Sequence, residues 1–188
     1  MLAQRGVVMF VALIVLIIMS LAGIAMLRQI GGGLSIAGNI AFKQAATTLA
    51  DVGTEQAVTL ITAKTNAIQS DVDDTANGYW SSAPNDVDPT DAYWASNYWN
   101  TAATVTGLPT SVGSGTRVQF VVHRLCDLAG KSPTEPGQRC SAFAVGGGSM
   151  TTGGPPPIPG VVQAYYRVTT KVTGPRNTVS YTQVVFKV

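Results

Sequence analysis

The sequence predicts an α+β fold, in which a long N-terminal helix, membrane-spanning in its first half, packs on an antiparallel β-sheet. Two observations predict it. Residues 7–27 form an uncharged apolar run, and β-rich segments gather in the last third of the chain. At about 1.5 Å per residue, the apolar run extends roughly 30 Å as a helix, which matches the hydrocarbon core of a bilayer.

The stub before the apolar run ends in Gln4-Arg5-Gly6. A cleaved secretory signal has an apolar stretch of about 7–15 residues and a small-x-small cleavage site, and this sequence fits neither feature. Two interpretations remain: a plain signal anchor, and a prepilin-type leader, which a peptidase cuts on the cytoplasmic side after a glycine. Because Arg5-Gly6 lies directly against the first apolar residue, we favour cleavage between Gly6 and Val7.

Charge and cysteines indicate the orientation. Arg5 and Arg28 flank the apolar run and nearly cancel under the positive-inside rule. A stub of six residues is too short to form a domain, so we expect it to stay in the cytoplasm. Cys126 and Cys140 enclose a loop with Pro and Gly and lack the close spacing of a zinc site. They predict a disulfide and an oxidising compartment, with two reduced, buried thiols as the alternative.

The helix is expected to continue beyond the membrane. The glycines at residues 31–33 predict a bend or a melted turn, since each weakens a helix by about 1 kcal/mol relative to alanine. A stripe then recurs mostly at steps of three and four to about residue 68, and its members are Ile36, Ile40, Ala41, Ala45, Leu49, Val52, Gln56, Leu60 and Ala63. We therefore divide the chain into residues 1–6 (leader), 7–30 (apolar helix), 31–70 (amphipathic helix) and 71–188 (globular head).

The head begins with a polar, turn-rich stretch to about residue 114, which we interpret as loop with short helical pieces. It holds three Tyr-Trp dipeptides, Tyr79-Trp80, Tyr93-Trp94 and Tyr98-Trp99. Adjacent aromatics point to different sides of a regular element, so one ring of each pair is expected to pack on the head. A contact with a partner or a glycan is the alternative role for these pairs.

Strand signals follow at residues 116–125, 161–173 and 177–188. A Gly-Pro-Arg-Asn turn at 174–177 predicts that residues 161–188 form an antiparallel hairpin. Three strands sharing an apolar face would cover the amphipathic helix. Residues 146–160 are rich in Gly and Pro and predict a long irregular connection, with no lysine of a phosphate loop.

These segments resemble the PilX-type minor pilins of bacterial type IV pili. The resemblance covers both ends of the chain and little of the middle. It rests on Gln4-Arg5-Gly6 with the apolar helix, Ala37-Gly38-Asn39, the helical stretch from Ala45-Ala46, Tyr166-Arg167-Val168-Thr169 and the run from Val172-Thr173 to Asn177-Thr178. It implies a pilin-like fold, with half of the helix protruding and a disulfide-closed loop near the C-terminus.

The resemblance also implies a route of processing and assembly. The chain would sit in the bacterial inner membrane with a periplasmic head, be cut by prepilin peptidase and methylated at Val7, and then join the pilus. Its partners would be other minor pilins, the major pilin, the inner-membrane assembly platform and, before assembly, membrane lipid. Most pilins carry glutamate as the fifth mature residue, where this chain has Val11. Minor pilins at the tip, and the related pseudopilin GspK, also lack it, so we expect a place at or near the pilus tip.

Two other classes remain open: a signal-anchored periplasmic binding or adhesion protein, and a minor pseudopilin of type II secretion. We expect no enzyme, because His123 is the single histidine and no Gly-x-Ser-x-Gly nucleophile motif occurs. We also expect no cofactor. Asp71, Asp73 and Asp74 begin like an EF-hand, but glycine and glutamate are missing from the sixth and twelfth positions. Asp86, Asp88 and Asp91 could still form an irregular Ca²⁺ site, but we favour the simpler interpretation that they are solvated loop carboxylates.

Charge is divided unevenly along the chain. Residues 29–110 carry two basic and eight acidic side chains, a net −6, and residues 111–188 carry eight basic and two acidic ones, a net +6. We expect these charges to cancel mainly within the head, with contacts to neighbouring subunits as the alternative. The basic residues are not interleaved with the aromatics, so nucleic-acid binding is not expected.

Overall fold

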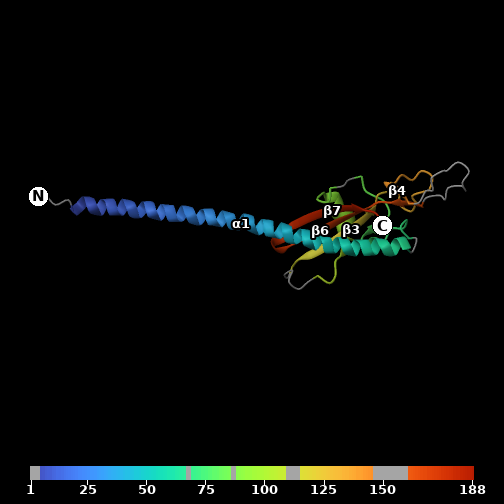
Figure 1. Cartoon of the computed structure of the whole chain (residues 1–188), viewed down its shortest axis with the longest axis horizontal. Helices are drawn as coiled ribbons and strands as arrows, with labels where there is room; N and C mark the ends of the chain where they lie inside the picture. Colours follow the sequence, from blue (N-terminus) through green and yellow to red (C-terminus); the bar gives the residue numbers. More distant parts are fainter. Residues whose placement is uncertain (1–4, 67–68, 86–87, 109–114, 146–160) are drawn as a thin grey trace, which may run out of the picture. The chain divides into compact units, whose positions relative to one another are not determined.

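The computed structural model describes residues 5–66, 69–85, 88–108, 115–145 and 161–188 (Figure 1). The chain forms two compact units, Met1–Gln44 and Ala45–Val188. One helix, α1 (Arg5–Asn66), contributes to both. The architecture is α+β, with a long apolar N-terminal helix and a mixed sheet. The irregular connection predicted for residues 146–160 lies outside the described residues.

In the first unit, the described residues 5–44 all belong to helix α1. The helix continues through residues 31–33 without a break, so the prediction of a melted turn there is wrong. Glycines weaken a helix, but starting a second helix after a break requires a new nucleus, which is unfavourable. The helical residues on both sides therefore keep residues 31–33 in the helical conformation.

In the second unit, residues 45–66 of α1 lie on the sheet through a stripe of small side chains. The buried positions recur at steps of three and four and are Ala46, Ala50, Gly53, Ala57 and Ile61. Small residues let the helix axis approach the strands closely. Figure 1 shows this part of α1 running alongside β3 (Arg117–Arg124) and β6 (Tyr166–Thr173). The periodicity agrees with the prediction, but the predicted face is wrong by one residue: Leu49, Val52 and Leu60 are only half-buried, because the close approach to the sheet selects the smallest side chains instead.

The main sheet has the order β1-β3-β6-β7, with β2 (Ala103–Thr104) also paired to β3. β3 and β6 are antiparallel, as are β6 and β7 (Val179–Phe186), so the predicted hairpin is confirmed for its long strands. β1 (Tyr79–Trp80) runs parallel to β3, however, so a purely antiparallel sheet is wrong. A parallel pair needs a long crossover, and residues 81–116 supply it.

A second, two-stranded sheet pairs β4 (Ala142–Val145) with β5 (Val161–Ala164). The segment predicted as one strand from 161 to 173 is thus divided at Tyr165 between two sheets. At that point the Tyr165 N–H donates to the Ser141 carbonyl and the Tyr165 carbonyl accepts from the Leu125 N–H, each at 2.8 Å. The division leaves β6 free to pair with both β3 and β7.

The stretch after α1 contains the predicted short helical pieces: η1 (Thr75–Asn77), α2 (Ala92–Trp94) and the π-helical turn η2 (Ala95–Trp99). It covers the face of the sheet opposite α1 with an aromatic layer, whose buried and half-buried members include Trp80, Trp94, Tyr98, Trp99 and Tyr181. Tyr79 and Trp94 are the buried rings of their pairs, as predicted, but Tyr98 and Trp99 are both buried.

Candidate functional site

The most distinctive surface of the first unit is the apolar side of α1. Large apolar side chains are exposed from Val7 as far as Ile40, with Leu34 and Ile36 76% and 62% exposed. Arg28 is the single charged residue between positions 6 and 42. Within the described part of the chain, one helix is long and apolar enough to cross a membrane. This surface needs an apolar environment.

The predicted processing residues lie at the beginning of this helix. Gly6 and Val7 belong to its first turn, and the Val7 side chain is 64% exposed. Val11, the fifth position after Gly6, follows one turn later and is 52% exposed. Residues four apart share a helix face, so Val7 and Val11 lie on the same apolar side.

In the second unit, a disulfide joins Cys126 and Cys140, which fits the predicted pairing. The two residues also form an antiparallel bridge, and the Asp127 N–H donates to the Arg139 carbonyl at 2.9 Å. The disulfide therefore closes a loop of residues 127–139 whose ends are already held by backbone hydrogen bonding.

A fully buried arginine lies next to this loop. Arg124 donates from Nε to the Ser81 carbonyl at 2.9 Å and from Nη2 to the Lys131 carbonyl at 2.6 Å, and its Nη1 pairs with the Asp71 carboxylate. The three acceptors come from the segment after α1, the end of β1 and the disulfide loop. Arg124 therefore ties three separate segments together in the head.

This arginine was missed by the sequence reasoning, although a signal existed. Val118, Phe120, Val122 and Arg124 alternate along β3 and are all buried, so Arg124 continues an apolar face of the strand. A charge on such a face predicts a buried partner. Asp71 comes from the acidic half of the chain, so the Arg124–Asp71 pair supports the expected cancellation within the head.

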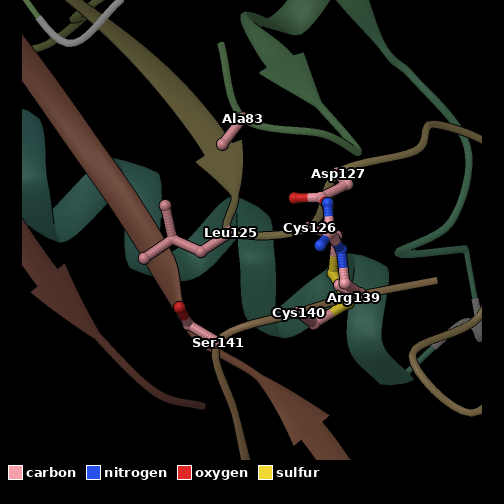
Figure 2. Close-up of a pocket in the computed structure, with 7 residues that line it drawn as sticks. All are labelled: Ala83, Leu125, Cys126, Asp127, Arg139, Cys140 and Ser141. Atoms are coloured by element: carbon pink, nitrogen blue, oxygen red, sulfur yellow. Dashed lines mark hydrogen bonds and ion pairs between the residues drawn. A yellow bond between two sulfur atoms is a disulfide. The ribbon is translucent and has the colours of Figure 1, made fainter. Parts of the chain in front are cut away.

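Figure 2 shows a cleft beside the disulfide, with a volume of about 370 Å³. Its lining consists of Ala83, Leu125, Cys126, Asp127, Arg139, Cys140 and Ser141. Arg139 Nε and Asp127 Oδ2 approach each other at 2.8 Å across one side of it. Both side chains are largely exposed, so this ion pair is solvated and of small energetic value.

His123 lies in the aromatic layer and not at a surface. It is fully buried, stacks on Trp80 at a centroid distance of 5.5 Å and meets the edge of Tyr98 at 4.6 Å. Neither ring nitrogen has a hydrogen-bond partner in the described structure. Burial, together with the positive charge of Arg167, lowers the pKa of His123 to about 3. The imidazole is thus neutral near pH 7 and acts there as a packing group.

In the described part of the chain, the candidate calcium residues hydrogen-bond to residues next to them in the sequence. The Asp88 carboxylate accepts from the Thr90 N–H and hydroxyl at 2.9 and 2.7 Å, and these hydrogen bonds lower its pKa. Asp91 caps α2 by accepting from the Tyr93 N–H at 2.7 Å. Asp86 lies outside the described residues. No group of three metal-binding side chains gathers among the residues described.

We compared the chain with protein-family models, curated proteins and solved structures, and none of the three comparisons found a match.

Proposed function

We propose that this chain is a pilin-type filament subunit, a minor pilin of the PilX kind that acts in type IV pilus assembly at or near the tip. The supporting observation is the length of the exposed apolar surface on α1. From Val7 to Ile40 a helix extends about 50 Å, whereas a bilayer's hydrocarbon core is about 30 Å thick. A plain membrane anchor needs about 20 apolar residues, so it does not explain the exposed apolar side chains beyond that length.

The excess apolar surface lies past Arg28 and includes Leu34, Ile36 and Ile40. Outside the bilayer, these side chains require another apolar surface, because leaving them in water costs roughly 25 cal/mol per Å². Parallel helices of neighbouring subunits supply such a surface along the full length of the rod. In this proposal the apolar helix moves from lipid into a helical bundle without passing through water, while the head remains outside.

Processing precedes this transfer. Prepilin peptidase cuts between Gly6 and Val7, and the new N-terminus of Val7 is methylated. Removal of the stub takes Arg5 away from the end of the rod, which leaves Arg28 as the remaining charged side chain in the apolar segment, together with the new α-amine of Val7. A buried charge in a helical bundle is costly unless it is paired.

The same argument supports a place at the tip. A carboxylate at the fifth mature position would pair with the N-terminal amine of a neighbouring subunit inside the filament. Val11 cannot do this, so the chain fits best where it does not have to neutralise such an amine. A subunit that starts the filament, and never docks beneath an older one, meets this condition.

The first experiment is mass spectrometry of the native protein. We expect a mature chain that begins with N-methylated Val7, and a Gly6→Leu variant that keeps the stub and fails to enter filaments. A native chain that keeps the residues before Val7 and stays in the inner membrane, while filaments form normally without it, would rule out the proposal and favour a signal-anchored binding protein.

A second experiment separates the filament role from plain anchoring. The double variant Leu34→Gln/Ile40→Gln changes only residues beyond a membrane span, so membrane insertion is expected to be normal and filament assembly to be lost. Glu55→Gln, at an exposed position farther along α1, is the matched control and is expected to assemble normally. Assembly of the double variant at the normal level contradicts the proposal. Co-assembly with secretion pseudopilins instead of pilins would assign the chain to type II secretion.

A further inference from the structure

Two buried polar side chains lie next to each other on the side of the sheet that carries the aromatic layer. His123 of β3 and Arg167 of β6 are paired in register. Directly opposite residues of an antiparallel pair have Cβ atoms about 4.5–5.5 Å apart. Val121, two residues before His123 on the same face of β3, packs in the aromatic cluster. The imidazole and the guanidinium therefore share one place in the interior of the head.

Both side chains bring nitrogens to this place that no protein group satisfies. His123 is fully buried and Arg167 is 7% exposed. Nδ1 and Nε2 of His123, and Nε and Nη2 of Arg167, are buried and have no hydrogen-bond partner in the described structure. Buried polar atoms of folded proteins are nearly always hydrogen-bonded, and an exception calls for an explanation such as a bound ion or water. Four such atoms on two adjacent side chains indicate a bound species between them.

The charge of Arg167 decides which species fits. Burial lowers the pKa of Arg167, but a guanidinium remains protonated in proteins. Among the described residues, no carboxylate forms an ion pair with it. A buried cation without a counter-charge is costly. A water molecule would accept the hydrogen bonds and leave the charge, whereas an anion accepts them and offsets the charge as well.

The nearby carboxylate of Asp73 does not fill this role. It lies close enough to act on Tyr98, a neighbour of His123 in the aromatic layer. Its Oδ1 atom, however, accepts from the Ser81 N–H and from the Ser81 hydroxyl at 2.6 and 2.7 Å. The counter-charge of Arg167 therefore has to come from outside the described protein groups.

The surroundings favour a small ion with a single charge. Rings of Trp80, Trp94 and Tyr98 pack around His123 at centroid distances of 5.5, 5.3 and 4.6 Å, which excludes bulky anions. Hydrogen bonds to a charged group are strengthened in such an apolar environment. On its other side, Arg167 is paired with Val185 of β7, which is 55% exposed. Arg167 thus lies between the buried imidazole and a strand at the surface.

We propose that Arg167 and His123 form an internal binding site for a small monovalent anion, of which chloride is the model. Arg167 donates from Nε and Nη2, and His123 donates from the ring nitrogen that carries its proton. The ion enters from the side of Val185, offsets the guanidinium charge and connects β3 to β6 within the aromatic layer. The site belongs to the head alone, so it does not depend on the filament role.

Bromide provides a direct test, because this heavy halide resembles chloride and quenches tryptophan fluorescence on contact. The full chain in detergent micelles is titrated with sodium bromide at pH 7, with sodium gluconate keeping the ionic strength constant. The rings of Trp80 and Trp94 lie 5.5 and 5.3 Å from that of His123, so we expect a saturable loss of fluorescence that chloride reverses. Quenching that only rises linearly with bromide means an internal water alone and overturns the proposal.

Two variants locate the bromide. Arg167→Met removes the guanidinium and keeps an aliphatic chain, so it is expected to weaken the saturable quenching about tenfold or more. Lys171→Met is the matched control, because Lys171 is a cation of the same strand whose Nζ lies 5.2 Å from the centre of the Trp99 ring. It is expected to keep the saturable quenching. Equal loss in both variants indicates general attraction of anions and overturns the site.

A second measurement needs no variant and covers the case in which Arg167→Met fails to fold. An ion that binds the folded head alone raises its stability by mass action. The thermal midpoint of the native chain is therefore expected to rise as chloride replaces gluconate at constant ionic strength. The same midpoint in both salts overturns the proposal.

Discussion

Gly53 of α1 lies so close to Thr170 of β6 that a Cβ atom on the glycine would come within 2.9 Å of the Thr170 Cγ2 atom. The same atom would lie 3.3 Å from the Val118 Cγ1 atom. The helix thus rests on the sheet at a point where only a hydrogen fits, and the small residues of its buried stripe allow this approach.

We expect Gly53→Ala to lower the free energy of unfolding by about 1 kcal/mol. Alanine favours the helix by about 1 kcal/mol, but overpacking a close contact costs about 1–3 kcal/mol and outweighs this gain. Urea denaturation in detergent, followed by the aromatic fluorescence of the head, measures the change.

Two variants show whether the contact is responsible. Gly38→Ala adds the same methyl group to α1 where no atom lies within 4 Å, so it is expected to be neutral or stabilising. Thr170→Ser removes the Cγ2 atom and is expected to restore most of the stability lost in Gly53→Ala. Equal stability of the two alanine variants would contradict the close contact.

Asp71→Asn is expected to destabilise the head by about 2 kcal/mol. Arg124 is fully buried and Asp71 is 31% exposed, so removing the carboxylate leaves a buried cation without its counter-charge. Thermal unfolding measures the loss. Asp127→Asn breaks the solvated pair with Arg139 and is the control, expected to change stability by less than about 0.5 kcal/mol. Similar effects of both variants would argue against the anchoring role of Arg124.

Replacing both cysteines, Cys126→Ser with Cys140→Ser, is expected to cost about 3 kcal/mol, the chain-entropy value for closing a loop of this size. The loop also presents the Lys131 carbonyl to Arg124, so the disulfide and Asp71 both support the same arginine. Combining the cysteine replacements with Asp71→Asn is therefore expected to cost less stability than the sum of the two separate losses. Denaturation with and without reductant checks this. If reductant leaves the native chain as stable as before, the disulfide contributes nothing to folding.

Local patterns in the sequence were sufficient for the long elements. Periodicity of three and four predicted that the second half of α1 has a buried face but placed that face one residue away, and the turn at residues 174–177 identified the hairpin of β6 and β7. These signals are contained within neighbouring residues. The parallel pairing of β1 with β3, and the division of a predicted strand at Tyr165, depend on contacts with distant segments, so no local pattern reports them.

The aromatic pairs show the same limit. An alternating strand would expose one ring of each pair, but Tyr98 and Trp99 lie in a π-helical turn, where neighbouring side chains are separated by a much smaller angle than the roughly 180° of a strand. Both rings can then reach the core. The partners of Arg124 were likewise not predictable, because Asp71 and Lys131 approach it only after the sheet and the disulfide loop have formed.

The buried histidine predicts how stability depends on pH. His123 has a pKa of about 3 in the folded head, below its ordinary value of 6.5, because burial and the nearby Arg167 disfavour the imidazolium. Between these two values the unfolded chain binds more protons than the folded one. Stability is therefore complete above about pH 6.5 and falls as the pH is lowered, with a limiting slope of about 1.4 kcal/mol per pH unit.

His123→Phe keeps an aromatic ring in the layer and removes the titrating group, so it is expected to flatten this dependence. The comparison belongs between pH 4.5 and 6.5, because the lowered pKa values of Asp74 and Asp88 act at more acidic pH. Denaturation midpoints of the native chain and the variant, measured at several pH values in this window, give the two slopes. Only the slopes are compared, so a different stability of the variant at pH 7 does not affect the test. Equal slopes would mean that His123 is accessible to protons in the folded head, contrary to its place between Trp80 and Tyr98.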